Sequence, residues 1–256
     1  MIQSVQRAMR LLSILADANH SPVRLSELAD RAELNKSTCA HLIDTLETEG
    51  YAVRISHSKG YVLGPAAYCL SRFGRYKSEL VATCRPVMQY LHRQLGKTVV
   101  LAVIEANNKY IIDCIDDGDI FEQKAHIRAD DIYRTATGRA ILANLDRDRL
   151  TDIFQKYGAP KAGDWPEVTS LDEMRRQLAK TDPHAVVATR QTQGTTVSIG
   201  YGTALFDRHG CCGAIGVAVN VSAADEKAFS AEDLHIRHLL ERGANEINRR
   251  LLHSTP

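Results

Sequence analysis

The chain has 256 residues, and its 44% hydrophobic and 25% charged residues are the proportions of an ordinary globular protein, for which this length favours two domains. Lys and Arg number 32 against 31 Asp and Glu, so no overall charge marks the chain for nucleic acid or an anionic membrane. No apolar run is long enough to span a membrane, and the six cysteines are scattered in apolar contexts. We therefore expect a reduced, cytoplasmic protein with no membrane partner, whose contacts with any charged partner are local.

The first 65 residues predict three helices followed by a hairpin. Apolar residues repeat at helical spacing over 5–16, and a short second helix begins near Leu25. Asn35 or Ser37 is placed to cap the N-terminus of the third helix. After Gly50 the apolar residues alternate, with a turn at "HSKG", which indicates a two-stranded hairpin.

The third helix has two unlike halves. Apolar residues at i, i+3, i+4 and i+7 predict one buried stripe, made of Cys39, Leu42, Ile43 and Leu46. On the other side, small polar and basic residues fill the first half and acidic residues the second. A recognition helix that enters the DNA major groove by its N-terminal residues has this arrangement, with the acidic half angled away. The sequence therefore predicts a helix-turn-helix motif, with the hairpin as its wing.

Candidate DNA contacts follow from this prediction. In the major groove we expect Lys36, Ser37, Thr38 and His41, and at the backbone or minor groove Arg24, Arg54, Lys59 and Tyr61. The alternative is a solvated helix with an ordinary cap, since residues 1–61 hold seven basic and seven acidic side chains. Because this region is neutral, one copy should bind weakly, and a homodimer or dimer of dimers on a palindromic double-stranded operator is required. The helix around residues 70–76 and the closing helix are expected to supply the subunit contacts.

The rest of the chain interleaves helices and strands. After further helices over 65–95, two β-rich runs meet at an "ANNK" turn within 98–116. Three helices are predicted over 135–181, then three strands over 185–222, and an amphipathic helix closes the chain. Hairpin-like joins at "ANNK" and "DRHG" indicate an α+β domain around an antiparallel or mixed sheet.

One segment suggests an anion site. "TATG", Thr135 to Gly138, begins a predicted helix and is flanked by Arg134 and Arg139. Its free N–H groups can receive a carboxylate, although a plain helix cap explains the same residues. Asn220 stands on an otherwise apolar strand and can hydrogen-bond either an effector or a neighbouring backbone group.

Other chemistry finds little support. The adjacent Cys211 and Cys212 can be a thiol sensor, but small hydrophobic residues at a strand start are favoured, because the sequence fixes no cation beside them. No C-x-x-C, H-E-x-x-H, G-x-S-x-G or phosphate-loop motif is present. We therefore expect no metal, no cofactor and no catalytic site.

Residues 4–70 closely resemble the DNA-binding domain of IclR-type bacterial transcriptional regulators. "NKSTCAHLIDTLETEGY" and the closing "GYVLGP" carry the most specific part of the resemblance. A weaker likeness continues through "YRTATGRAILANL", which is similar to the family's T-A-S-G-K-A-x-L-A segment, and through "LFDRHGCCGAIGVAVNVS". The resemblance implies a winged helix-turn-helix domain over 1–65, a linker helix over 66–77 and a GAF-like effector-binding domain over 78–256.

The resemblance also implies the effector site. The family's pocket residues transfer to Ala136, Thr137, Thr195, Val197, Ala218 and Asn220. Two departures stand out: His41 replaces a usual Arg, and Arg190 lies at or beside a usually acidic position, where we expect it to help bind an anion. The implied ligand is a small carboxylic acid, aromatic in preference to a small keto acid.

These features together predict a regulator whose operator binding is modulated by a small carboxylate. An enzyme acting on a small acid, with the first domain as a dimerising module, is the alternative, although no nucleophile and base motif supports it. A structural adaptor that uses the winged domain for protein contact is a third interpretation.

Overall fold

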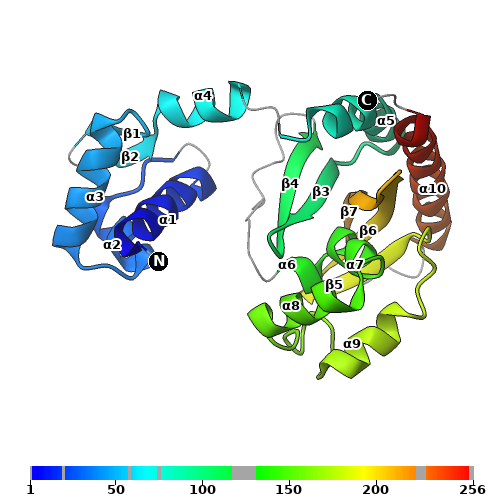
Figure 1. Ribbon diagram of the computed structural model, residues 1–256. Coiled ribbons are helices and arrows are strands. Elements are labelled where there is room, and N and C mark those ends of the chain that lie inside the picture. Colours follow the sequence, from blue (N-terminus) through cyan, green and yellow to red (C-terminus); the bar gives the residue numbers. More distant parts are fainter. Residues whose placement is uncertain are drawn as a thin grey trace. The chain divides into compact units, whose positions relative to one another are not determined.

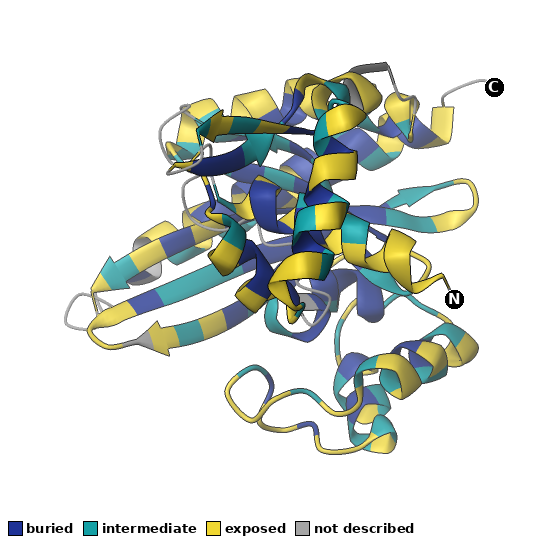
Figure 2. Cartoon of the chain, turned by 90° about the vertical axis from the view of Figure 1, so that its left-hand side faces the viewer, coloured by how far each residue is buried: buried dark blue, intermediate teal, exposed yellow. Residues whose placement is uncertain are grey.

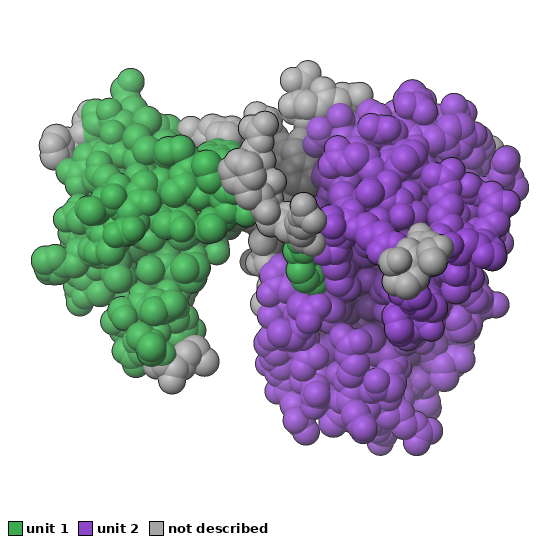
Figure 3. Space-filling view, turned by 45° about the horizontal axis from the view of Figure 1, so that its top comes forward, with its two compact units in different colours: residues 1–76, 122–126 green, residues 77–121, 127–256 purple. Residues whose placement is uncertain are grey.

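The computed structural model describes residues 2–18, 21–56, 59–73, 76–116, 131–222 and 229–253. Its described residues divide into two compact units, the first ending at Tyr76 and the second beginning at Lys77 (Figure 3). This division lies within one residue of the predicted start of the effector-binding domain.

Unit 1 contains the predicted helices and hairpin. Its elements are α1 (Gln3–Asp17), α2 (Leu25–Ala32), α3 (Lys36–Thr48), β1 (Ala52–Ser56), β2 (Gly60–Leu63) and α4 (Pro65–Phe73) (Figure 1). The buried faces of α1, α2 and α3 meet around Leu11, Leu28 and Ile43, each fully buried. The strands pair antiparallel, and Val23 adds a bridge to Tyr61 just before α2. Helix-turn-helix and wing are thereby joined in one small core.

Unit 2 is a sheet with helices on both faces. Its strands are β3 (Val99–Glu105), β4 (Asn108–Ile115), β5 (Val187–Gln193), β6 (Thr196–Asp207) and β7 (Gly210–Ser222). They pair antiparallel in the order β4-β3-β7-β6-β5. Its helices are α5 (Ser78–Leu95), α6 (Asp131–Arg134), α7 (Ala136–Leu142), α8 (Arg147–Tyr157), α9 (Leu171–Leu178) and α10 (Ser230–His253). The predicted α+β fold is confirmed.

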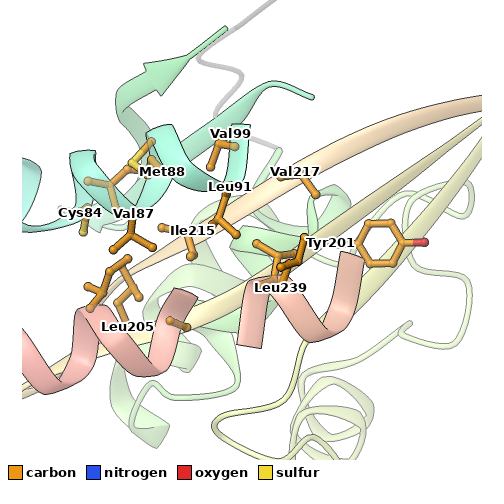
Figure 4. Packing of buried hydrophobic residues seen from close by; sticks show 14 of the residues in the cluster. Cys84, Val87, Met88, Leu91, Val99, Tyr201, Leu205, Ile215, Val217 and Leu239 are labelled. Carbon is orange, nitrogen blue, oxygen red and sulfur yellow. The ribbon is translucent and has the colours of Figure 1, made fainter. Parts of the chain in front are cut away.

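Buried, intermediate and exposed residues follow one another along the strands (Figure 2). Because side chains alternate along a strand, each residue belongs to one face of the sheet. Over 196–205 of β6 and the paired residues 213–222 of β7, odd-numbered residues, such as Tyr201 and Ile215, pack with α5 and α10 (Figure 4). Even-numbered residues, such as Ala204 and Ala214, pack with α6 to α9. Any residue in these two stretches can therefore be placed on the α10 face or on the α7 face.

Helix α7 lies unusually close to its face. A Cβ atom at Gly202 would come 2.5 Å from the backbone nitrogen of Thr137, and one at Gly216 would come 2.5 Å from the Thr137 methyl carbon Cγ2. The "GYG" of β6 is thus explained by packing, because only glycine leaves room for the start of α7. Gly138 is similarly confined, since its Cβ would meet the Ile132 carbonyl oxygen at 2.1 Å.

Within the part of the chain that the structure describes, no helix has both the length and the apolar character needed to cross a membrane.

Replacing Gly202 by alanine tests this contact. We expect Gly202→Ala to lower the free energy of unfolding of unit 2 by roughly 1–3 kcal/mol, because its Cβ meets backbone that cannot move aside. Calorimetric melting of the full chain gives the measurement. Gly163→Ala is the matched control, since nothing lies within 4 Å of a Cβ at Gly163. Equal melting of the Gly202→Ala variant and the unsubstituted chain would contradict the packing described.

Candidate functional site

Helix α3 begins at a defined cap. The side-chain oxygen Oδ1 of Asn35 accepts a hydrogen bond from the Thr38 backbone N–H at 2.8 Å, so Asn35 is the cap of the two predicted candidates. The turn before it is made by Glu33, in the left-handed conformation with φ 57°. Cap and turn together fix where the first residues of α3 point.

The exposed side of α3 agrees with the predicted division. Cys39, Ile43 and Leu46 are buried and Leu42 partly so, which confirms the apolar stripe. Among the candidate major-groove contacts, Lys36, Ser37 and His41 are exposed and Thr38 is half-buried. Unit 1 therefore presents its short polar and basic side chains on the first turns of α3.

Two of the other candidate contacts lie on accessible surface. Arg24 precedes α2 and is exposed. Lys59 is exposed in the wing, where its backbone N–H donates to Ser56 Oγ at 3.0 Å. Residues 57 and 58 of the predicted wing turn lie outside the described residues.

The prediction for Tyr61 is wrong. Its side chain is only 5% exposed and belongs to the core of unit 1, and burial raises the pKa of its phenol. Its backbone forms the bridge to Val23 through hydrogen bonds of 2.8 and 2.9 Å. Tyr61 therefore anchors the wing and is not placed to contact DNA.

Arg54 forms ion pairs within unit 1. Its Nη2 atom lies 3.0 Å from Asp44 Oδ1 and 3.3 Å from Glu47 Oε2, both on the second half of α3. The guanidinium carbon lies 4.9 Å from the centre of the Tyr61 ring. Arg54 thus compensates the acidic half of α3, which lowers the repulsion that these carboxylates would exert on a phosphate backbone.

In unit 2, "TATG" is a helix cap. Thr135 Oγ1 accepts from the Gly138 N–H at 3.2 Å and from Lys109 Nζ at 2.8 Å. Ala136 and Thr137 are 4% and 5% exposed, and Thr137 is held against Gly216. The cap alternative therefore accounts for most of this segment, and a bulky residue at Thr137 would displace α7.

Strand register places two predicted effector residues on the other face of the sheet. Arg190 is opposite Ile199, and Val197 is opposite Val221, and both partners pack with the α10-side core. Residues directly opposite in a ladder share a face, so Arg190 and Val197 face away from α7. Thr195 is exposed at the turn between β5 and β6, beyond the strands. Arg190 and Val197 are therefore not placed to line a pocket under α7, and Thr195 stays a prediction.

Ala218 and Asn220 do lie on the α7 face. Ala218 is opposite Gly200, whose Cβ would contact Ala136 at 3.7 Å. Both residues are exposed, and beyond Val217 the described part of β7 pairs only with β6. An open stretch of sheet therefore extends past α7. We call this part of the α7 face the effector floor, and its residues are Gln191 of β5, Ser198 and Gly200 of β6, and Ala218 and Asn220 of β7.

Two cations border the effector floor at the junction of α6 and α7. Lys109 is only 6% exposed, and its ammonium group contacts Thr135. Arg134 Nε donates to Gln191 Oε1 at 2.6 Å, while Gln191 Nε2 donates back to the Arg134 carbonyl at 3.2 Å. Sequence reasoning missed Lys109, Gln191 and Ser198, because only strand register brings them to this face.

Arg139, the other flanking cation, is used in packing. Its guanidinium carbon lies 4.3 Å from the Trp165 ring centre, and its Nε donates to the Tyr133 carbonyl at 2.7 Å. Burial lowers the pKa of Arg139 to about 10.

The cysteines fit the structural interpretation. Burial raises the pKa of Cys211 to about 11 and that of Cys212 to about 12, which disfavours the reactive thiolate. Across the described ranges, no group of three or more His, Cys, Asp and Glu side chains is placed to hold a metal ion.

Comparison with known families agrees with both units. The model of the "Bacterial transcriptional regulator IclR C-terminal" family matches residues 76–249, and that of the "IclR helix-turn-helix domain" matches residues 4–56. This chain belongs to the IclR family. Family membership favours a regulator over the enzyme alternative, since the family consists of bacterial transcriptional regulators.

Curated relatives are regulators too. The chain is 27% identical over 160 residues to the transcriptional repressor IclR of Escherichia coli (strain K12), covering 61% of this chain and 58% of that protein. It is 25% identical over 155 residues to the HTH-type transcriptional regulator KdgR of the same organism, covering 60% and 58%. The matches thus span less than two thirds of the relatives' length.

Solved structures share the fold. An IclR transcriptional regulator from Alicyclobacillus acidocaldarius aligns with a TM-score of 0.72 at 19% identity, over 97% of this chain and 98% of that one. An IclR homolog from Microbacterium hydrocarbonoxydans, complexed with 4-hydroxybenzoate, aligns with a TM-score of 0.65 at 18% identity, also over 97% and 98%.

Removing the cap of α3 tests how this surface is held. We expect Asn35→Ala to destabilise unit 1 by about 1 kcal/mol, because the Thr38 N–H loses its acceptor at the helix start. Asn35→Ser, which keeps an acceptor, should retain most of the stability. Thermal unfolding followed by circular dichroism measures both. Equal melting of the Asn35→Ala variant and the unsubstituted chain would show that the cap contributes nothing.

Proposed function

We propose that this chain is a homodimeric, ligand-responsive transcriptional regulator that binds a palindromic operator through the first half of α3. The main support for this proposal is the uneven distribution of charge along α3. Lys36, Ser37 and His41 are exposed at its capped end, while Asp44 and Glu47 are compensated by Arg54. The region 1–61, which has no net charge, can in this way offer a locally favourable surface to DNA.

Arg24 and Lys59 complete the proposed DNA surface. Both are exposed, and lysine and arginine beside a recognition helix commonly contact phosphates. Arg54 contributes indirectly, by neutralising carboxylates that would otherwise repel the duplex.

Exposed apolar side chains support the dimer. Leu70 and Tyr76 beside α4 are 65% and 51% exposed, and Leu234 and Leu252 of α10 are 68% and 55% exposed. These are the two regions expected to supply subunit contacts. Burying large apolar side chains of this kind is a main source of association energy.

Two substitutions test the DNA surface. Thr38→Ala should weaken specific operator binding by about 1–3 kcal/mol if Thr38 contacts a base. Lys36→Ala should weaken binding to all sequences and lower the salt slope by about 1, because one phosphate contact is lost. Fluorescence anisotropy with the DNA flanking the protein's own gene, over a range of salt concentrations, measures both effects.

Thr48→Ala is the control for this experiment. Thr48 is exposed at the far end of α3, where its hydroxyl donates to the Asp44 carbonyl of the same helix. It should leave operator affinity unchanged. Full operator affinity in both the Thr38→Ala and the Lys36→Ala variants would exclude the proposed orientation.

The proposed effector is a small carboxylic acid, aromatic in preference to a small keto acid, bound on the effector floor beside Ala136 and Thr137. Lys109 and Arg134 supply positive charge there in place of Arg190. Ala218 and Asn220 leave open space on the same face. The 4-hydroxybenzoate complex of the Microbacterium protein is consistent with an aromatic acid in this fold.

Filling the effector floor should abolish the ligand response. We expect Ala218→Leu to prevent carboxylates from shifting stability and operator affinity, while operator affinity without ligand stays unchanged, because Ala218 is exposed and belongs to unit 2, whereas the proposed DNA surface belongs to unit 1. A ligand that binds only the native state adds about 2.7 kcal/mol at 100 times its dissociation constant. Thermal shift with benzoate, 4-hydroxybenzoate, glyoxylate and pyruvate measures the response.

Thr192→Leu is the matched control, since Thr192 is exposed on the same sheet but opposite Val197, on the other face. A normal ligand response in the Ala218→Leu variant would move the site elsewhere. Conversion of any of these acids to product would instead support the enzyme alternative.

A further inference from the structure

Three polar residues form a row across the effector floor. Gln191 of β5 is directly opposite Ser198 of β6, which is directly opposite Asn220 of β7. Opposite residues share a face, and Ser198 has the same parity as Gly200 and Gly202, which meet α7. The row therefore lies on the α7 face, just past the start of that helix, and spans two strand spacings or about 9–10 Å.

The β5 end of the row is positively charged and already fixed. Both polar atoms of the Gln191 amide bond to Arg134, one as acceptor and one as donor. Asp164 Oδ1 lies 3.8 Å from the same Nε atom of Arg134, and the Arg134 side chain remains 30% exposed. Gln191 thus holds the guanidinium in place, and the guanidinium can meet an anion with its outer N–H groups.

The β7 end of the row is polar but uncharged. Ser198 is half-buried and Asn220 is exposed, and neither side chain has a hydrogen-bond partner among the described residues. A hydroxyl group and an amide can each both donate and accept, as a ligand hydroxyl can. No carboxylate or ammonium group belongs to the row itself. A second charged group on a ligand would therefore find no counter-charge at this end.

We propose that Ser198 and Asn220 determine effector specificity by hydrogen-bonding an uncharged hydroxyl group of the effector, while Arg134 binds its carboxylate. This inference rests on the proposed effector site. The ligand class becomes a hydroxylated monocarboxylic acid whose two polar groups are separated by a ring or a short chain. A site that hydrogen-bonds a ligand hydroxyl discriminates strongly against the analogue that lacks it.

Matched pairs of acids test the assignment. The probes are benzoate with 4-hydroxybenzoate, and butyrate with 4-hydroxybutyrate, titrated calorimetrically into the full-length chain. The hydroxylated acid should bind more tightly in at least one pair. Ser198→Ala and Asn220→Ala should each lower its affinity by about 5- to 30-fold while changing that of the unhydroxylated acid less than about twofold, because only one hydrogen bond is removed.

Two controls separate specificity from folding. Ser198→Thr keeps the hydroxyl and should keep the preference. Thr192→Ala removes a hydroxyl from the opposite face of the β5–β6 hairpin and should change the affinity for neither acid. The assignment is overturned if Ser198→Ala and Asn220→Ala lower the affinity for both acids to the same extent, or if they leave both affinities unchanged.

Operator binding in the same samples distinguishes failure of the inference from failure of the proposed function. The inference alone is overturned if the acids bind and shift operator affinity, but substitutions at Ser198 and Asn220 leave the preference for the hydroxylated acid unchanged. Operator binding with no response to any of the four acids overturns the inference and the carboxylate effector. No operator binding at all overturns the proposed regulator.

Discussion

The contact between the start of α7 and the glycines of β6 and β7 determines the geometry of unit 2. Gly202 and Gly216 let the backbone and methyl group of residues 136 and 137 approach closer than any Cβ would permit. Because this contact determines the position of α7, it also determines which part of the sheet α7 covers. Ala218 and Asn220 lie just past that limit and remain exposed, although strand neighbours such as Val217 and Val219 are buried on the other face. The open surface is therefore a consequence of the tight packing beside it.

Ion pairs within unit 1 compensate the acidic residues of α3. Residues 1–61 hold equal numbers of acidic and basic side chains, so an even distribution would give little attraction to DNA. Arg54 instead reaches from the wing to Asp44 and Glu47, and its guanidinium also covers the buried ring of Tyr61. This joins the wing to the rear half of α3 and leaves the capped front half with Lys36 and His41 uncovered. Stability of the wing and the electrostatics of the helix thus depend on the same arginine.

The sequence predicted elements well and strand faces poorly. The stripe of Cys39, Ile43 and Leu46 was predictable, because helical spacing tolerates an error of one residue at either end. Arg190 and Val197 were misplaced because strand side chains alternate with period two, so a shift of one residue moves a side chain to the opposite face. Tyr61 was misjudged for a related reason: an aromatic residue on a predicted wing gives no sign of whether it points into the core.

The same distinction separates the parts of the effector region that can vary from those that cannot. Thr135, Thr137 and Gly138 are occupied by capping and packing, so changing them disturbs α7 before it affects a ligand. Asn220 and Ala218, by contrast, are exposed, and substitutions at such positions usually change stability little. Ligand preference in this architecture can therefore be altered on the strands while the helix start stays constant. A family resemblance carried by the "TATG" segment consequently identifies the fold of the domain, whereas in the proposed effector site the strand residues beyond it would determine what the domain binds.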